Sequence, residues 1–176
     1  MVKHIFFITG ASGTGKTTLV SELKKKYKNK NWEFIHFDSV GIPSTEKMIE
    51  SSGSIENWQR DTTCIWIKKM LTEYEDKEVI IFEGQVNLKF IKKGFSKNKF
   101  LDYEIILIDC NEEIMAKRLT RGRKQPELLN QDMKNWLNFL RNQAKKINAN
   151  IIDTSNNTKS EVRESFENIL KRNQVI

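Results

Sequence analysis

The stretch that most constrains this chain is Gly10–Thr17, which reads GASGTGKT and fills every fixed position of the phosphate-binding pattern G-x-x-x-x-G-K-[ST]. Residues 2–8 before it are apolar and β-prone, and residues 17–27 after it carry apolar side chains at a helical spacing. Glycines let backbone N–H groups turn toward an anion, and the following helix N-terminus adds partial positive charge. The sequence therefore predicts a strand, a phosphate-binding loop and a helix, with a chance glycine-rich turn as the alternative.

The residue types in this loop have distinct roles in binding a nucleotide. Lys16 is predicted to reach the β- and γ-phosphates, and the Thr17 hydroxyl is predicted to hold Mg²⁺. We expect ATP and Mg²⁺ to bind here, and the nucleotide-binding residues are predicted to be Gly10, Ser12, Gly13, Thr14, Gly15, Lys16, Thr17 and Thr18.

The bulk composition favours one domain spanning residues 1–176, with no linker. The chain is 38% apolar and 30% charged, and it has only two prolines and eight glycines. Its net charge of +7 favours polyanions or phosphorylated metabolites as partners, although abundant lysine on helix surfaces explains much of this charge. Cys64 and Cys110 lack metal-ligand spacing and are expected to be free and reduced. The apolar runs are too short for a membrane span or a signal peptide, so we expect a cytoplasmic protein.

A second predicted strand, residues 32–37, stops at Asp38. Ligands of open parallel sheets bind at the carboxyl ends of the strands, so Asp38 is expected to lie near whatever Lys16 holds. A turn or helix-capping aspartate is the alternative explanation.

Residues 44–75 have a helical pattern that is broken once. Ser44 or Thr45 can cap a short helix, 51–53 break it, and Ser54 can cap a longer one. An enlarged helical insertion between two strands is a natural place for an acceptor-binding flap. Its apolar side is predicted to consist of Ile55, Trp58, Thr62, Ile65, Trp66 and Met70. Its polar candidates are Gln59, Arg60 and Asp61, for which a solvated helix face is an equally good explanation.

A third strand, residues 79–82, is continuously apolar and is followed by Glu83, Gly84 and Gln85. Glu83 can orient Mg²⁺ through water, position an attacking group or bind substrate, and Gly84 allows close backbone approach. A salt bridge at a strand terminus is the alternative for Glu83. The basic segment 89–99 that follows contains aromatic residues and is predicted to be a half-buried amphipathic helix, although such segments also bind single-stranded nucleic acid.

The second half of the chain carries an arginine cluster. A clear strand at 103–109 is followed by a helix capped by Asn111, which runs into Arg118, Arg121 and Arg123. Guanidinium groups on a movable lid suit phosphoryl transfer, because the charge of the γ-phosphoryl group must be stabilised once both substrates are in place. A basic surface turn is the alternative.

The last third is predicted to hold a long helix, a strand and a final helix. An apolar stripe repeats with a helical period over 133–147, and Arg141 flanks it as a candidate to face the phosphates. The last strand, 150–152, ends at Asp153, and residues 158–161 form a capping box for the final helix.

This order of elements resembles the P-loop nucleoside and nucleotide kinase family, which includes adenylate, shikimate and gluconate kinases. The resemblance spans nearly the whole chain, but only the Walker A loop is a specific motif. It implies a three-layer α/β/α fold with a five-stranded parallel sheet, an acceptor-binding insertion at about 42–76 and an arginine-rich lid at about 118–130.

The resemblance also implies roles for individual residues. Asp38 corresponds to the acidic residue that contacts the acceptor or acts as base, and the lid arginines stack on adenine and neutralise the transferring phosphate. Asp153, Thr154 and Ser155 are implied to lie beside the adenine ring. Glu83 and Gly84 are similar to the Asp-Gly of the family, but Gln85 stands where nucleoside monophosphate kinases begin the Pro-Arg that grips the acceptor phosphate.

The sequence thus predicts an ATP- and Mg²⁺-dependent kinase whose acceptor is a small-molecule hydroxyl or phosphate. Catalysis is assigned to Lys16, Asp38, Arg118, Arg121 and Arg123. Metal binding is assigned to Thr17 and Glu83, and acceptor binding to Asp38, Arg60, Glu83, Gly84 and Gln85. The alternatives are a 5′-hydroxyl polynucleotide kinase, which would bind nucleic acid, and a nucleotide-dependent regulatory ATPase. We expect no membrane partner, and a monomer or a homodimer.

Overall fold

The computed structural model describes residues 4–122 and 124–176 and contains a five-stranded, all-parallel sheet with the strand order β2-β3-β1-β4-β5. The strands are β1 (His4–Thr9), β2 (Trp32–His36), β3 (Val79–Glu83), β4 (Tyr103–Asp109) and β5 (Asn150–Asp153). The α-helices are α1 (Lys16–Lys26), α2 (Thr45–Ser52), α3 (Ile55–Thr72), α4 (Leu88–Lys97), α5 (Glu112–Lys117), α6 (Gln131–Lys146) and α7 (Lys159–Arg172). The predicted fold class is confirmed.

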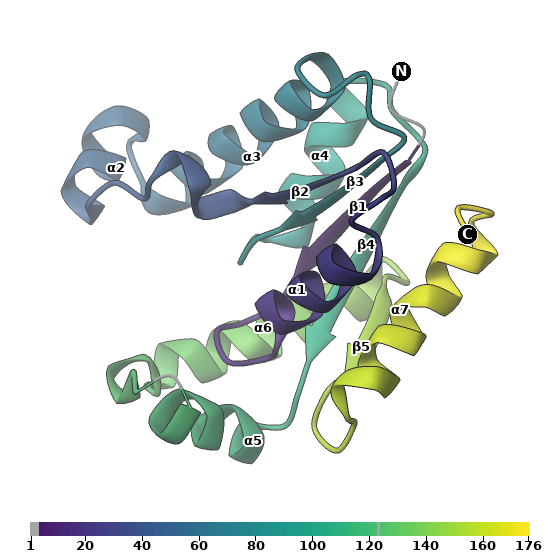
Figure 1. Cartoon of the computed structure of the whole chain (residues 1–176). Helices are drawn as coiled ribbons and strands as arrows, with labels where there is room; N and C mark the ends of the chain where they lie inside the picture. Colours follow the sequence, from purple (N-terminus) through teal and green to yellow (C-terminus); the bar gives the residue numbers. More distant parts are fainter. Residues whose placement is uncertain (1–3, 123) are drawn as a thin grey trace.

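Helices cover both faces of the sheet, as Figure 1 shows. Successive strand residues point to opposite faces, so Ile5 and Phe7 of β1 pack under α3, α4 and α6. Phe6 and Ile8 of the same strand pack against α1 and α7. A smaller buried cluster joins the phosphate loop to α5 and α6; it consists of Ala11, Cys110, Met115, Leu119 and Leu137. These clusters fix the loop that follows β1 between two layers of helices.

Most predicted helix boundaries are confirmed by capping hydrogen bonds. The side chains of Ser44, Ser54 and Asn111 each accept a hydrogen bond from the first turn of α2, α3 and α5, respectively. Thr158 and Glu161 form the reciprocal capping box predicted for α7. The segment at 89–99 is the half-buried amphipathic helix that its pattern predicts.

Two sequence predictions need correction. The second strand ends at His36 rather than Phe37, because Phe37–Val40 turn into a short 3₁₀ helix that contains Asp38. Ile55 and Ile65 of α3 are about half exposed, at 50% and 56%, and do not belong to its buried side. That side instead includes Thr63 and Ile67, since α3 packs against α4 as well as the sheet. Val2, which began the predicted first strand, lies outside the described residues.

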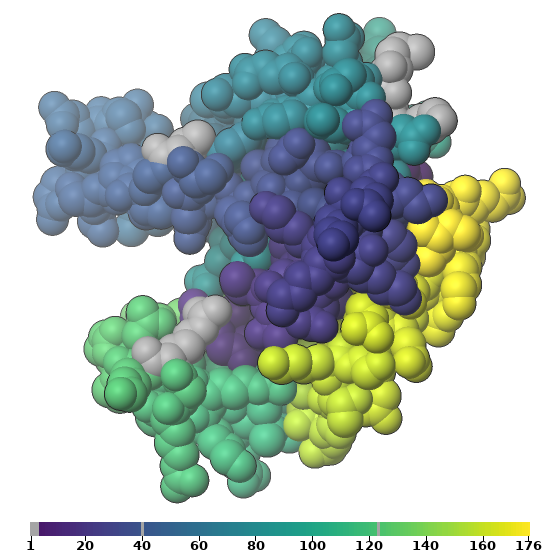
Figure 2. All heavy atoms as spheres, viewed as in Figure 1, coloured from purple at the N-terminus to yellow at the C-terminus, as the bar shows by residue number. Residues whose placement is uncertain are grey.

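Two regions extend beyond the sheet at the carboxyl ends of the strands (Figure 1). One is α2 with the start of α3; the other is α5 with a π-helical turn, Arg118–Gly122, and a 3₁₀ turn, Pro126–Leu128. Figure 2 shows a hollow between these regions, with the phosphate loop at its inner end. Across the described residues, no helix has the length and apolar character needed to cross a membrane. Cys64 and Cys110 are free, as predicted.

Candidate active site

The phosphate loop leaves the N-terminus of α1 open. Gly15 is the N-cap of α1 in a left-handed conformation with φ of 104°, and it provides no side-chain cap. The other six α-helices of the described chain begin with a capping side chain, which is contributed by Ser44, Ser54, Asn87, Asn111, Asn130 and Thr158. The first N–H groups of a helix have no intrahelical partner, so those of α1 are available to an anion.

Lys16 lies across this loop. Its side chain is largely buried, with 8% exposed, and its Nζ donates a hydrogen bond of 3.0 Å to the carbonyl oxygen of Ala11. Thr14 Oγ1 donates to the same carbonyl at 2.9 Å. The loop thus holds a positive charge at its own centre, where it can attract phosphate oxygens.

Thr17 and Glu83, both predicted to hold a metal ion, contact each other. Thr17 Oγ1 donates a hydrogen bond of 2.7 Å to Glu83 Oε1, which joins the start of α1 to the end of β3. Glu83 is 7% exposed, and its other oxygen, Oε2, accepts no hydrogen bond from the described residues. His36 Nδ1 lies 3.2 Å from Oε2, because the strand register places His36 opposite Glu83. The two carboxylate oxygens therefore have different surroundings.

This arrangement fits a magnesium ion bound together with phosphate. A hydroxyl and a carboxylate are suitable oxygen ligands, and the buried Oε2, which lies 3.2 Å from His36 Nδ1, accepts no hydrogen bond from the described residues. Within the described residues no group of three or more His, Cys, Asp or Glu side chains could hold a metal on its own. Mg²⁺ commonly binds through one or two protein oxygens, with phosphates and waters completing its shell.

The loop after β3 is fixed to both the phosphate loop and α3. Ser12 Oγ donates to Gln85 Oε1 at 3.0 Å, while Gln59 Nε2 donates to the Gln85 carbonyl at 3.2 Å. Gln59 Oε1 also accepts from the Asn87 N–H at 3.1 Å. Gln59 therefore links α3 to the loop after β3.

Gly84 is required by packing. A Cβ atom at this position would lie 2.7 Å from the Cβ of Phe37, so the backbone after β3 closely approaches the turn after β2. The close approach that the sequence predicts at Gly84 is therefore made to a protein side chain in this structure.

Asp38 and Arg60, two predicted acceptor-binding residues, have exposed or local surroundings. Asp38 is exposed on the turn after β2. That strand is two strands away from β1, about 10 Å at the usual strand spacing, and β3 with Glu83 lies between them. Arg60 donates from Nε and Nη2 to the two oxygens of Asp61, at 2.8 and 3.2 Å. This bonding raises the pKa of Arg60 and lowers that of Asp61.

Arg118 is fixed between two segments that are distant in sequence. Its guanidinium donates to Thr154 Oγ1 at 2.8 Å and to the Thr154 carbonyl at 2.7 Å. It also donates to the carbonyls of Gly13 and Thr14 at 3.4 and 3.2 Å. Arg118 is thus part of the wall between the phosphate loop and the turn after β5.

Asp153 and Ser155, the residues on either side of Thr154 in the turn after β5, form hydrogen bonds with each other. Asp153 Oδ1 accepts hydrogen bonds from both the backbone and the hydroxyl of Ser155, at 2.9 and 2.6 Å. Partial burial opposes ionisation of Asp153, but these hydrogen bonds outweigh it and lower the pKa of the carboxyl group. The pair therefore shapes the turn that carries Thr154.

Arg121 and Arg141 have surroundings that differ from those of Arg118. Arg121 is exposed on the π-helical turn, and Arg123 lies outside the described residues. Arg141 donates from Nε to Asp109 Oδ2 at 2.7 Å and from Nη2 to the Cys110 carbonyl, so it supports the end of β4. It is hydrogen-bonded to protein groups in the position where the sequence suggested a phosphate contact.

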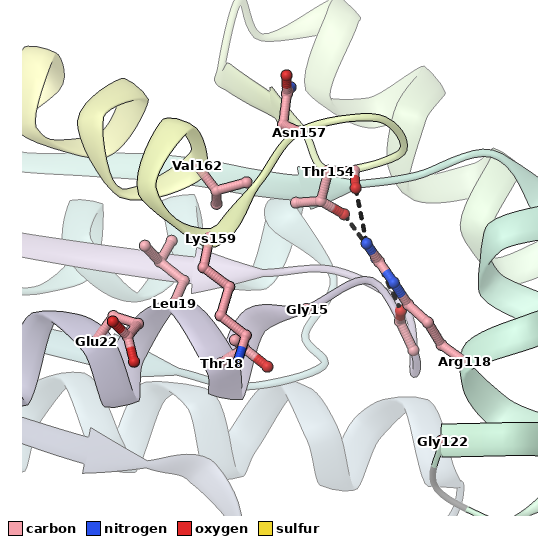
Figure 3. A pocket seen from close by; sticks show the side chains of 11 residues that line it. Gly15, Thr18, Leu19, Glu22, Arg118, Gly122, Thr154, Asn157, Lys159 and Val162 are labelled. Atoms are coloured by element: carbon pink, nitrogen blue, oxygen red, sulfur yellow. Dashed lines mark hydrogen bonds between the residues drawn. The ribbon is translucent and has the colours of Figure 1, made fainter.

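A cavity of about 290 Å³ lies beside the phosphate loop, between α1, α7 and the π-helical turn (Figure 3). Its size is at the lower end of the range for small-molecule sites. Its lining includes the predicted residues Gly13, Gly15, Thr18, Arg118 and Thr154, and it also includes Leu19, Glu22, Gly122, Asn157, Lys159 and Val162. Four of the predicted nucleotide-binding residues, Gly13, Gly15, Thr18 and Thr154, thus line this cavity together with Arg118.

Sequence reasoning missed several residues of this site. His36 is close to Glu83 only because β2 and β3 are neighbours in register, and the sequence does not give the strand order. Glu22, Asn157 and Lys159 line the cavity through the approach of α7 to α1. A local signal existed only for Glu22, which is one helical turn after Thr18 on α1.

A sequence model described as the AAA domain matches residues 6–137. A search of curated protein sequences found no match.

Several solved structures are similar to this chain, and two of them are kinases. A gluconokinase from Sinorhizobium meliloti 1021 has a TM-score of 0.65 and 15% identity, over 97% of this chain and 93% of that one. A shikimate kinase from Aquifex aeolicus vf5 has a TM-score of 0.61 and 21% identity, over 97% and 98%. At these identities the likeness shows the fold alone, and it agrees with the predicted α/β fold with a five-stranded parallel sheet.

Proposed function

Because the chain belongs to the AAA domain family and has the fold described above, we propose that it is an ATP- and Mg²⁺-dependent phosphotransferase. The single observation that carries this proposal is the arrangement at the start of α1. An uncapped helix N-terminus, a centrally held Lys16 and the Thr17–Glu83 contact converge beside a hollow that a second substrate can enter. Solved structures of kinases with small acceptors share the fold, and this supports the proposal.

The proposed reaction is in-line transfer of the γ-phosphoryl group to an acceptor hydroxyl. Lys16 and the N–H groups of α1 hold the β- and γ-phosphates, and Thr17 and Glu83 hold Mg²⁺. When bound, Mg²⁺ neutralises charge on the phosphate oxygens. Asp38 accepts the proton of the acceptor hydroxyl as it attacks, and Arg121 and Arg123 on the lid stabilise the charge that develops.

Arg118 has a separate role in this proposal. Its hydrogen bonds to Thr154 and to the loop carbonyls fix it beside the cavity, so we assign it to the nucleoside end of ATP. A planar guanidinium in that place can stack on an aromatic base.

The hydrogen bonds that Arg60 makes with Asp61 favour an acceptor that carries no phosphate group. A guanidinium that binds both oxygens of Asp61 is not presented as a bidentate site for an acceptor phosphate. We therefore place sugars, sugar acids and other alcohols before nucleoside monophosphates as acceptors.

The experiment that tests this proposal is ADP release from Mg-ATP, with and without pooled acceptors. The pools are nucleosides, nucleoside monophosphates, sugar acids, aminoglycoside-type and other alcohols, and 5′-hydroxyl oligonucleotides. Lys16→Ala is the blank, and Lys24→Ala, an exposed change on the same helix, is the matched control. We expect one pool to stimulate release in the wild type and in Lys24→Ala, and no stimulation in Lys16→Ala.

Two other outcomes would change the assignment. Slow release that no pool alters would contradict a kinase and favour a nucleotide-dependent regulatory ATPase. Stimulation by the oligonucleotide pool alone, weakening steeply with salt, would favour a polynucleotide kinase. The exposed lysines of α4 would then be the candidate contacts, namely Lys89, Lys92, Lys93 and Lys97.

A further inference from the structure

One lysine that lines the cavity beside the phosphate loop has no assigned role in the proposed nucleotide site. Lys159 is the first residue of α7, and Figure 3 shows its side chain reaching across the cavity toward Thr18 of α1. Within the described part of the chain, its ammonium group has no hydrogen-bond or ion-pair partner. Lys159 therefore brings an uncompensated positive charge over the cavity.

The path of a nucleotide places a phosphate at this point. In the proposed nucleotide site, the terminal phosphates bind at the N-terminus of α1, where Lys16 and Thr17 lie, and the base and ribose occupy the cavity. Thr18 is the next residue along α1 and lines the cavity. The phosphate that is attached to the nucleoside must pass between these two regions, which is where Lys159 points.

The other charged groups of the cavity are already paired. Glu22 Oε1 accepts from Lys25 at 3.2 Å, and its Oε2 lies 3.6 Å from Arg163 Nη1. Arg118 is bound to Thr154 and to the loop carbonyls. Lys159 is thus the cation of this lining that remains available to a ligand.

Lys159 also occupies a position that is unfavourable for its own helix. The capping box formed by Thr158 and Glu161 fixes the start of α7, so Lys159 stands at the positive end of the helix dipole. A cation at that end destabilises the helix slightly, whereas Lys171 in the last turn stabilises it. Local rules of this kind are often broken where a side chain serves function.

We propose that Lys159 binds the phosphate group nearest the nucleoside and makes the cavity select nucleotides over nucleosides. This inference rests on the proposed nucleotide site. It assigns to α7 a part in phosphate binding that the Walker A motif does not include.

The test compares Lys159→Met with Lys171→Met, an exposed change at the other end of the same helix. Binding of ADP is measured by calorimetry at physiological salt, and adenosine is measured as a competitor of bound ADP. Lys159→Met is expected to raise the Kd of ADP about 10-fold, as loss of one charge-assisted contact predicts. The Kd of adenosine, calculated from the competition with ADP, is expected to stay unchanged. Lys171→Met is expected to bind ADP as the wild type does.

Thermal unfolding of the nucleotide-free proteins separates this role from a structural one. The Tm of Lys159→Met is expected to stay the same or rise by about 1–2 °C, and that of Lys171→Met to fall by a similar amount. Unchanged ADP binding in Lys159→Met would overturn the inference while leaving the proposed function intact. Equal weakening of ADP and adenosine would also overturn it, and a wild type that binds no ADP would remove the proposed function itself.

Discussion

The two sides of the proposed site are held together by different kinds of contact. On the nucleotide side, Arg118 and Thr154 join segments that are far apart in sequence: Thr154 donates to the Thr14 carbonyl at 2.7 Å and accepts from Arg118. On the acceptor side, the insertion is bonded mainly within itself, as in the pairing of Arg60 with Asp61 and Asn57. Ile42, Ile49 and Ile55 on this side are each about half exposed.

The difference indicates how the two halves would work. Contacts between distant segments hold the nucleotide side in one shape before a ligand binds. This suits the phosphate groups of a nucleotide, because their geometry is constant. Contacts within the insertion leave α2 and the start of α3 able to move relative to the sheet, which suits closure over a second substrate. The two sides are linked by hydrogen bonds that run from the Gln59 amide through Gln85 to the Ser12 hydroxyl.

The largest expected effect comes from Asp38, on the acceptor side. Asp38→Asn removes the proposed base but keeps the size of the side chain, so kcat should fall by about 10²- to 10⁴-fold. The Kd of ADP should stay within about twofold of the wild type, because Asp38 is exposed and outside the nucleotide cavity. Steady-state kinetics and calorimetry measure the two quantities. A variant that keeps full acceptor-dependent activity would assign the base elsewhere, with Glu83 the next candidate.

The features of the site that could be predicted from the sequence are those set by residues close together in the chain. Helix caps such as Ser54 and Asn111 obey rules that act over three residues, and the structure confirms them. The Walker A loop is similarly local, because its glycines and Lys16 lie within eight residues. The contact of Thr17 with Glu83 could be predicted, because Thr17 follows the loop after β1, Glu83 ends β3, and both strands end at the same edge of the sheet.

Features that depend on strand order or helix packing could not be predicted from the sequence. His36 meets Glu83 only because β2 and β3 are paired in register, and Arg118 meets Thr154 across 36 positions of sequence. The error at Ile65 has the same origin. Helical periodicity finds an apolar stripe, but the buried face of α3 is decided by its packing against both the sheet and α4.

A smaller effect is expected on stability from Arg118, on the nucleotide side. Arg118→Met removes four hydrogen bonds and leaves the Thr154 carbonyl without that donor, so unfolding should become easier by about 2–3 kcal/mol. The matched variant Arg121→Met removes an exposed guanidinium from the same turn and should change stability by less than about 0.5 kcal/mol. Chemical denaturation with coincident optical probes measures both. Equal stabilities of the two variants would refute a prebuilt nucleotide side.

The smallest expected effect uses the one cysteine that each side provides. Cys110 is 1% exposed in the cluster beneath the phosphate loop, and burial raises the pKa of its thiol, whereas Cys64 is half-buried on α3. A thiolate must form and be reached before it reacts, so a maleimide should label Cys64 at least about 10-fold faster than Cys110. ADP at saturating concentration should slow Cys110 further and leave Cys64 unchanged, since binding suppresses opening only where the ligand makes contacts. The variants Cys64→Ser and Cys110→Ser isolate each rate in mass spectrometry. Protection of Cys64 by ADP alone would show that the insertion already closes on the nucleotide, and the two sides would then be coupled before any acceptor binds.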